Sequence, residues 1–295
     1  MSDTYLGATP VPAMADELAP HERQKLRARS FRETPYRFAE RMVMGTHFAL
    51  LPGRVQHLPR LLSAVGADLL RGGTQVPDPE RVVACPDLFG GVCRSYDATS
   101  IIEAAKVGFS AWCHIGPQKW LTFPDRMVLF FDENHIAKRL RRDMKSKGYR
   151  VTFDTAFEDV IVACAGRRSY RRHGLTWITP QVMRVYADLF DRGVAHSFEV
   201  WNKDGILAGG GFGLSIGRIF ITDSQFSWES NTSKIGFASL NHHLAKWGYV
   251  LNDGKCHTPT IAAMGFRLIP RQEHLRLLRE HAHDGGRIGR FTVED

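Results

Sequence analysis

The sequence lacks long apolar runs and any segment that resembles an export signal. Its longest strongly apolar run, at residues 160–165, is too short to span a bilayer. The N-terminus MSDTYLGATPVPAM has no basic segment followed by an apolar one. We therefore expect a cytoplasmic protein without stable membrane insertion.

The sequence also lacks the spacings of common metal and cofactor sites. Its five cysteines are odd in number and include no CxxC pair, which argues against both a disulfide framework and a zinc site. None of the thirteen histidines forms a helical i, i+4 pair beside a carboxylate. No Arg-x-x-Gly-x-Gly loop for a pyrophosphate occurs, so coenzyme A is not indicated. We expect neither a metal nor a bound cofactor.

Positive charge is in excess. The 295 residues include 39 Lys and Arg against 31 Asp and Glu, a formal net charge of +8. This excess favours polyanionic partners, and nucleic acid and acidic membrane surfaces both fit it. An apolar fraction of 43% is ordinary for a globular protein of one large or two small domains.

The rest of the chain is organised around residues 195–234. Residues 195–201 alternate as a half-buried strand does, and 202–205 supply turn chemistry. A second strand runs into glycines 209–211, where missing side chains let a backbone or a ligand approach closely. Gly217 makes the next turn before a third strand at 218–224. This pattern predicts a three-stranded meander with polar groups at its end.

The same stretch carries a resemblance to a known family. The order AHSFEVW, GG-x-G-x-x-IGR-x-F, DSQFS and NTSK resembles the leucyl/phenylalanyl-tRNA–protein transferases, which carry AHS-x-E-x-W, a Gly-rich strand, GESMFS and NASK at the same spacing. Shorter matches extend the resemblance over about residues 76–280. Several linked motifs in one order are more specific than any one of them.

The resemblance implies an α/β fold with a mixed sheet of the N-acetyltransferase-like (GNAT) type. We expect four segments: an N-terminal extension at 1–75, partly disordered and then helical; a small N-terminal domain at 76–127; the GNAT-like acyltransferase domain at 128–281; and a tail at 282–295. Two or three basic amphipathic helices fit residues 21–70, with breaks at Pro35 and Pro52. They form either an extra layer docked on the core or a basic surface for tRNA, lipid or a partner protein.

Two basic clusters are candidate contacts to the tRNA backbone. The first cluster lies on one face of a predicted helix. The second follows another predicted helix, which ends at Ala165. Thr155 and Glu158 are expected to cap the N-terminus of that second helix. A solvated charged face is the alternative for both. The clusters are Lys138, Arg141, Arg142 and Lys145, and Arg167, Arg168, Arg171 and Arg172.

Transfer of an aminoacyl group to an amine needs a deprotonated amine, donors for the carbonyl oxygen and a proton for the leaving ribose hydroxyl. The resemblance places Asp223, Asp253 and Lys255 at this chemistry, Asp253 as a base or proton relay. Asp223 replaces the family's Glu, and Lys255 replaces its Gln. The lysine can form an ion pair with Asp253. These departures imply a different acceptor or altered chemistry at a retained tRNA-end site.

The resemblance also assigns a pocket for the terminal adenosine and the aminoacyl group. Gln225 stands where the family has Met, and Asn252 where it has an apolar residue, which suggests a donor more polar than Leu or Phe. Core packing is the alternative for the pocket aromatics. The pocket residues are Trp112, Trp177, Phe220, Gln225, Phe237, Leu240, Leu244 and Asn252, and residues expected to support the site are Ser224, Asn231, Ser233 and Lys234.

The sequence thus predicts an aminoacyl-tRNA-dependent aminoacyltransferase that acts as a monomer. Charged tRNA would be its co-substrate, and its acceptor the N-terminus of a protein or peptide, or a small amine. Two alternatives stay open. One is a GNAT-type N-acyltransferase that uses a thioester donor on a lipid or small amine, and the other a non-catalytic protein that binds tRNA ends or N-termini.

Overall fold

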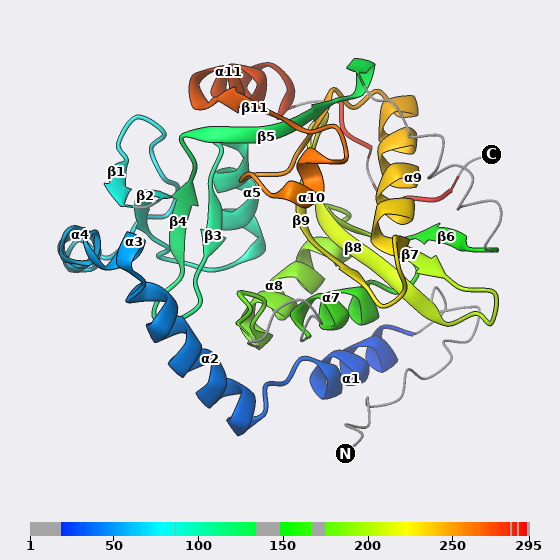
Figure 1. The fold of residues 1–295 in the computed structure, drawn as a ribbon, viewed down its shortest axis with the longest axis horizontal. Helices are drawn as coiled ribbons and strands as arrows, with labels where there is room; N and C mark the ends of the chain where they lie inside the picture. Colours follow the sequence, from blue (N-terminus) through cyan, green and yellow to red (C-terminus); the bar gives the residue numbers. More distant parts are fainter. Residues whose placement is uncertain are drawn as a thin grey trace.

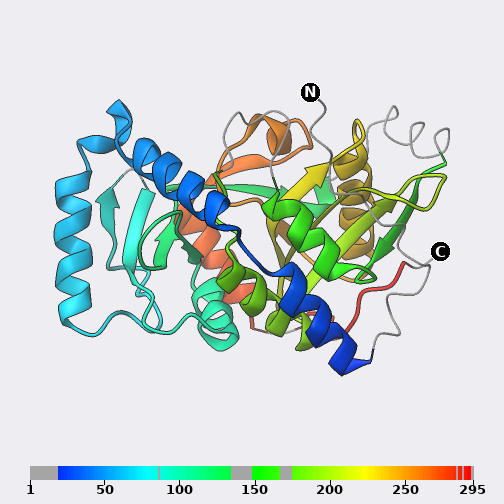
Figure 2. The ribbon, with the colours of Figure 1, turned by 90° about the horizontal axis from the view of Figure 1, so that it is seen from below.

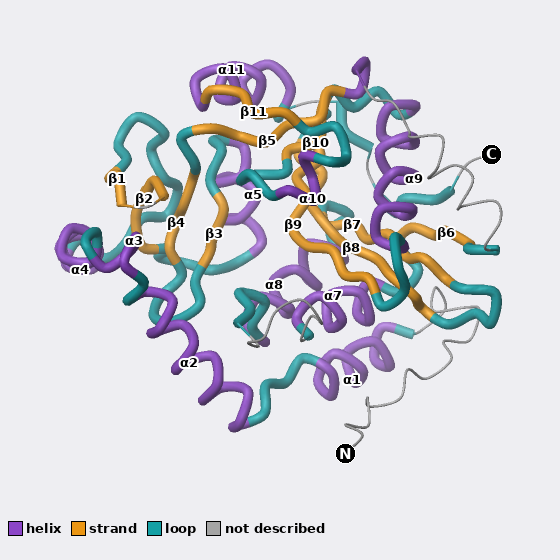
Figure 3. Tube along the Cα trace, viewed as in Figure 1, coloured by secondary structure: helices purple, strands orange, loops and turns teal. Residues whose placement is uncertain are grey.

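Two β-sheets and the helices around them make up the computed structural model (Figure 1). It describes residues 19–85, 87–133, 148–166, 175–283, 285–287 and 289–293. Figure 3 shows the helices gathered around the larger sheet and along the outer side of the smaller one. This mixed α/β architecture agrees with the fold class predicted from the sequence.

The smaller sheet has four antiparallel strands in the order β1-β2-β4-β3. They are β1 (Val83–Cys85), β2 (Asp87–Val92), β3 (Ser110–Trp112) and β4 (Lys119–Thr122). Helix α5 (Ala98–Lys106) connects β2 to β3, and its N-terminus is capped by Asp97, whose carboxylate accepts from the backbone N–H of Ser100 at 2.8 Å. Buried Cys85, Phe89 and Val92 fill the space under this sheet.

The larger sheet has seven strands in the order β11-β5-β10-β9-β8-β7-β6. Every neighbouring pair is antiparallel except β9 and β10, so the predicted meander continues into a parallel pairing. The strands are β5 (Asp125–Phe130), β6 (Arg150–Phe153), β7 (Ala195–Trp201), β8 (Leu207–Ile216), β9 (Ile219–Ser227), β10 (Leu251–Asp253) and β11 (Arg267–Pro270). Strand β5 of this sheet spans residues 125–130 and so crosses the predicted boundary between the domains 76–127 and 128–281. The division into these domains stays a prediction.

Helices cover both faces of the larger sheet (Figures 1 and 2). A β-carbon at Gly209 would clash with Thr232 of α9, whereas one at Gly210 would lie 3.3 Å from Val160 of α7, so these helices lie on opposite faces. The helices are α7 (Phe157–Ala165), α8 (Pro180–Asp191), α9 (Thr232–Lys246), α10 (Pro259–Ala262) and α11 (Arg271–His281), with a 3-10 turn at Phe131–Glu133.

The glycines of β8 make room for aromatic rings. A β-carbon at Gly211 would lie 2.7 Å from ring atoms of Phe198, and one at Gly213 would lie 2.6 Å from the ring of Phe220. Both phenylalanines are buried on the α9 side of the sheet. The glycines of β8 are therefore closely approached, as expected, but by phenylalanine rings of the protein itself.

The helix start predicted at Thr155 and Glu158 is wrong by one residue. Thr179 caps α8, accepting from the Val182 N–H at 3.4 Å. The N-cap of α7 is Ala156, which has no capping side chain, so Thr155 lies one position before the N-cap. Its hydroxyl donates to the carboxylate of Glu199 at 2.9 Å and thus contacts β7.

From residue 19, where the described part begins, four helices precede the smaller sheet, more than the two or three predicted, and two of them begin at the predicted breaks, Pro35 and Pro52. They are α1 (Pro20–Ser30), α2 (Pro35–Ala49), α3 (Pro52–Val55) and α4 (Leu58–Leu70). Arg27 holds α1 to the core through ion pairs with Glu158 of α7 at 2.8 Å and Asp191 of α8 at 2.5 Å. The extension is therefore docked on the core at its first helix.

The C-terminal segment also packs on the larger sheet. Phe291 is fully buried, and its ring stacks on His196 of β7 with centroids 3.5 Å apart. The carboxylate of Asp154 accepts from the Phe291 backbone N–H at 2.7 Å and from the His196 ring at 2.8 Å. At least this part of the predicted tail contributes to the core.

Glu199 gives the fold a specific pH dependence. Burial raises the pKa of Glu199 to about 7, although hydroxyls of Ser197 and Thr152 donate to its carboxylate. As pH rises from 4.5 to 7, the carboxyl ionises in the unfolded chain before it does in the fold, so folding loses stability. We expect the free energy of unfolding to fall by about 2 to 3 kcal/mol from this group between pH 5 and pH 8.

The measurement is urea unfolding of the wild type and Glu199→Gln at both pH values. The variant is expected to lack this share of the pH dependence, because its amide does not titrate. An identical pH slope in the two proteins would contradict the assignment.

Candidate functional site

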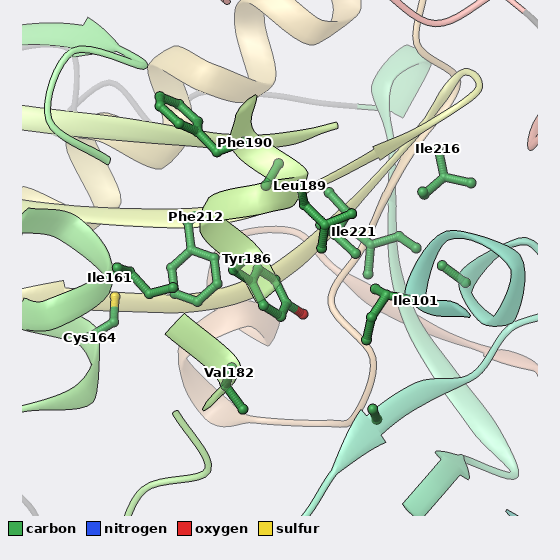
Figure 4. Close-up of a cluster of buried hydrophobic side chains, with 14 of the residues drawn as sticks. Ile101, Ile161, Cys164, Val182, Tyr186, Leu189, Phe190, Phe212, Ile216 and Ile221 are labelled. Carbon is green, nitrogen blue, oxygen red and sulfur yellow. The ribbon is translucent and has the colours of Figure 1, made fainter. Parts of the chain in front are cut away.

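The candidate site is a small cavity where the two sheets meet. It has room for about one water molecule. In Figure 4 the ring of Tyr186 lies beside Phe212, and its hydroxyl points away from Phe212 toward Ile101. The cavity is lined by Ile101 and Ala105 of α5, Phe109, Ser110 and Ala111 at β3, Tyr186 of α8, Leu214 of β8, Ile221 and Asp223 of β9, and Lys255.

Asp223 and Lys255 form an ion pair at the wall of this cavity. The Lys255 ammonium donates to Oδ1 of Asp223, whose side chain is fully buried, while that of Lys255 is 14% exposed. Burial raises the pKa of Asp223, and the positive charge of Lys255 opposes this shift. The ammonium also lies 5.7 Å from the centre of the Trp177 ring, within range of a cation–π contact.

The second oxygen of Asp223, Oδ2, is buried. Oδ2 has no partner at regular hydrogen-bonding geometry. The Tyr186 hydroxyl nevertheless acts on this carboxylate and lowers its pKa, while burial raises the pKa of Tyr186 well above the usual value. The carboxylate therefore has capacity to accept a further hydrogen bond.

Asp253 lies beneath the ion pair and is enclosed. Its carboxylate accepts from Arg126 Nε at 3.2 Å and Nη2, and from His274 Nε2 at 3.0 Å, and all three side chains are at most 1% exposed. Burial alone would raise the pKa of Asp253, but the charge of Arg126 and the contact with His274 hold it far below its ordinary value. A carboxylate with such a low pKa is a weak general base.

Asp253 shapes the turn that carries Lys255. Its Oδ1 accepts from the Lys255 backbone N–H at 2.7 Å, and Lys255 has a left-handed φ of 65°. This conformation is costly for a residue with a side chain, and the surrounding bonds maintain it. The expected ion pair between Asp253 and Lys255 is therefore wrong: the backbone of Lys255 binds Asp253, and its ammonium reaches Asp223.

Four predicted pocket residues lie together on the opposite, α9 face of the sheet. They are at most 1% exposed and form one apolar cluster, as the core-packing alternative expected: Phe220, Phe237, Leu240 and Leu244. Asn252 lies among them and uses its amide within the protein. Its oxygen accepts from Thr222 at 2.7 Å, and its nitrogen donates to Asn241 at 2.8 Å. Both polar atoms of the Asn252 amide are thus hydrogen-bonded within the protein.

The other pocket residues are dispersed. Trp177 packs edge-on against Tyr186, with centroids 6.0 Å apart, on the side of the cavity. Trp112 belongs to β3 and contacts the rings of His114 and Phe123. Gln225 is half-buried on β9, opposite a glycine of β8. Of the predicted pocket set, Trp177 contacts the Asp223–Lys255 pair, through the Lys255 ammonium.

The predicted support residues cluster where α9 begins. Asn231 has a left-handed φ of 67°, which asparagine tolerates better than most residues. The Ser233 N–H donates to the hydroxyl of Ser227 at 3.0 Å, which ties the helix to the end of β9. Ser224 is buried and Lys234 half-buried nearby in the sequence. The two predicted basic clusters, at 138–145 and 167–172, lie outside the described residues.

Arg126, His274 and Tyr186 belong to the site, and sequence reasoning missed them. Arg126 and Asp253 are 127 positions apart, and His274 and Asp253 are 21 apart. No local periodicity connects residues so distant. An apolar strand that opens with an arginine was the one available signal, because such a side chain needs a buried partner.

Within the described part of the chain, no group of three His, Cys, Asp or Glu residues is placed to hold a metal ion. Over the same residues, no helix combines the length and apolar character needed to cross a membrane.

Comparisons with known proteins agree with the motif order. The model of the leucyl/phenylalanyl-tRNA protein transferase family matches residues 128–279. A leucyl/phenylalanyl-tRNA–protein transferase of Azotobacter vinelandii is 39% identical over 214 residues, 72% of this chain and 93% of that protein. The one from Pseudomonas syringae pv. syringae is 39% identical and is covered to 92%.

Solved structures resemble the chain much less. The structure of L-PGS from Bacillus licheniformis covers 48% of this chain and 50% of its own, at 13% identity and a TM-score of 0.32. A similarity this low supports no statement about a shared fold, so the GNAT-like type stays a prediction.

The buried Arg126–Asp253 pair is expected to be essential for stability. Arg126→Leu leaves a fully buried carboxylate without its cationic partner, which costs about 3 to 5 kcal/mol. Urea unfolding measures the loss. Arg192→Gln, which removes an exposed pair with Asp188, is the matched control and is expected to cost at most about 1 kcal/mol. Equal losses in the two variants would contradict the importance of the buried pair.

Proposed function

The chain belongs to the leucyl/phenylalanyl-tRNA protein transferase family, and we propose that it transfers an aminoacyl group from charged tRNA to the amino group at a protein N-terminus. The observation that carries this proposal is the extent of the match: 39% identity over 93% of a relative that bears this name. The enzyme is accordingly an aminoacyltransferase with charged tRNA as its co-substrate.

The reaction is acyl transfer from an ester to an amine. The amine attacks the ester carbonyl carbon, the carbonyl oxygen becomes an oxyanion, and the tetrahedral intermediate collapses with release of the ribose hydroxyl. The amine loses a proton and the ribose oxygen gains one. Because the ester is already activated, the site needs no covalent intermediate and no cofactor. It needs positioned charge and a route for the proton.

Lys255 and Asp223 are our candidates for the groups that contact the reacting atoms. The Lys255 ammonium can donate to the developing oxyanion or to the leaving ribose oxygen, and such donors contribute most when they are fixed in advance. Asp223 holds the ammonium and lines the cavity, and its second carboxylate oxygen is buried without a regular hydrogen bond. Asp253 acts as a positioning residue: its burial and low pKa suit it to hold the Lys255 turn rather than to accept a proton.

The choice of donor amino acid follows from the pocket residues. The hypothesis of a donor more polar than Leu or Phe used Gln225 and Asn252. Since Asn252 is satisfied by Thr222 and Asn241, the hypothesis now rests on Gln225 alone. A screen of individual aminoacyl-tRNAs decides between a leucyl or phenylalanyl donor and a more polar one.

The finer fold assignment is part of the same proposal. A mixed sheet with one parallel pair, β9 and β10, and helices on both faces supports an N-acetyltransferase-like domain for residues 128–281. We further propose a monomer located in the cytoplasm.

The activity itself is tested with a pool of labelled aminoacyl-tRNA and a peptide that bears an N-terminal Arg. We expect the label to move to the peptide, and we expect ribonuclease treatment of the donor pool to abolish transfer. Peptides with neutral first residues and small amines serve as alternative acceptors. Acylation from a thioester, with no effect of ribonuclease, would overturn the proposal in favour of an N-acyltransferase.

Lys255→Met tests the site. Loss of the ammonium is expected to lower kcat about 100-fold to 1,000-fold, the usual cost of a fixed oxyanion donor. Single-turnover transfer measures this effect. Lys203→Met, which removes an exposed lysine from the turn between β7 and β8, is the control and should transfer at the wild-type rate. A Lys255→Met enzyme with unchanged kcat would show that the reacting atoms lie elsewhere.

A further inference from the structure

The N-terminal helices expose far more apolar surface than the rest of the protein. Fourteen large apolar side chains are exposed in the described residues, and ten of them fall within residues 36–70. Leu70 is 92% exposed, Tyr36 70%, and Val43 and Leu62 65% each. Single exposed apolar residues are ordinary, but a concentration of this kind in one segment marks an interaction surface.

Three exposed residues of α2 and its C-cap form a stripe, whereas exposed Phe38 lies on the side of Gly45. Tyr36, Val43 and Leu50 are spaced by seven positions, which places them on one side of the helix. The opposite side carries Gly45, the one buried residue of α2, where a β-carbon would lie 2.7 Å from Ile115. The helix therefore packs on the protein with one side and presents an apolar stripe with the other.

Helix α4 has the same division. Its inner residues, among them Leu61 and Val65, pack against the buried residues of the smaller sheet. Leu62, Leu69 and Leu70 point outward. In Figure 2, α2 and α4 line the outer side of the molecule, next to the smaller sheet. We call the exposed sides of α2, α3 and α4 the outer face.

The charge on the outer face has one sign. Residues 34–71, which contain α2, α3 and α4, hold five Arg and no Lys against two Asp and Glu, a net charge of +3. Between residues 34 and 75 no acidic side chain is exposed. The Asp68 carboxylate accepts from the Thr74 hydroxyl and the Val92 N–H, and Glu40 is half-buried. Arg60 and Arg71 are exposed beside the leucines of α4.

We propose that the outer face docks on an anionic lipid surface. Helices that lie in a membrane interface combine an apolar side, which enters the boundary of the acyl chains, with basic residues that meet the lipid phosphates. The outer face has both features and no exposed acidic residue. Nucleic acid would use the arginines but would leave the leucines in water, because RNA contacts are largely polar and charged.

This contact does not depend on the transferase reaction, because the residues of the outer face are not those that line the cavity. It would hold the enzyme at a membrane surface peripherally.

The test is sedimentation of the full-length protein with lipid vesicles. Vesicles that contain phosphatidylglycerol are expected to bind the protein at least tenfold more strongly than vesicles of phosphatidylcholine alone. Binding should weaken as salt is added, because salt screens the attraction between exposed charges. Equal binding to both vesicle types, or binding to neither, would overturn the proposal.

Two sets of variants separate the apolar contribution to vesicle binding from the electrostatic one. The triple variant Leu62→Ser, Leu69→Ser and Leu70→Ser should lower vesicle binding at least tenfold, and Arg60→Gln with Arg71→Gln should lower it about 25-fold, at about fivefold for each arginine. The arginine pair should change binding to phosphatidylcholine little. Leu268→Ser and Lys203→Gln, exposed residues outside the outer face, are the matched controls and should bind as the wild type does.

Other occupants of the outer face give different results. If the leucine variant leaves vesicle binding unchanged but converts a dimer to a monomer, the face contacts a second copy of the chain. If the arginine variant loses affinity for tRNA and not for vesicles, the face binds nucleic acid. Either result would overturn the lipid proposal. Because transfer to a soluble peptide should be normal in all these variants, failure of the lipid contact is distinguishable from failure of the proposed activity.

Discussion

The ion pair between Arg126 and Asp253 is the contact on which the arrangement of the site depends. It joins β5 to β10 inside the larger sheet, and His274 adds α11 to the same carboxylate. Arg126 also donates to the carbonyl oxygen of Gly108 at 3.2 Å, which ties in the segment that leads to β3 of the smaller sheet. Because a buried charge is costly without its partner, this network fixes the two sheets and the last helix in one relative position.

That position decides where Lys255 points. Asp253 accepts from the backbone of Lys255, the turn adopts its left-handed conformation, and the ammonium reaches Asp223 beside the cavity. Asp253 thus positions the Lys255 side chain through the backbone of Lys255. The two aspartates differ in environment: Arg126 and His274 lower the pKa of Asp253, whereas burial raises the pKa of Asp223, which lines the cavity.

The sequence was sufficient for the elements and the family, because both depend on short-range patterns. The strands at 195–201 and 207–216 and the glycine turn after them follow from alternation and turn residues. The linked motifs indicated the transferase family, which the comparisons confirmed. The predicted cap at Thr155 was wrong: α7 begins one residue later, and the Thr155 hydroxyl contacts Glu199, a residue 44 positions away.

By itself, then, the sequence determined the meander at 195–224, the excess of positive charge and the family, since each is a pattern of neighbouring residues. Only the tertiary structure decided which ionisable groups meet. It paired Lys255 with Asp223, enclosed Asp253 with Arg126 and His274, and placed Phe220 and Asn252 on the other side of the sheet. The physical reason is that side-chain pairing depends on which strands become neighbours, and strand order joins residues more than a hundred positions apart.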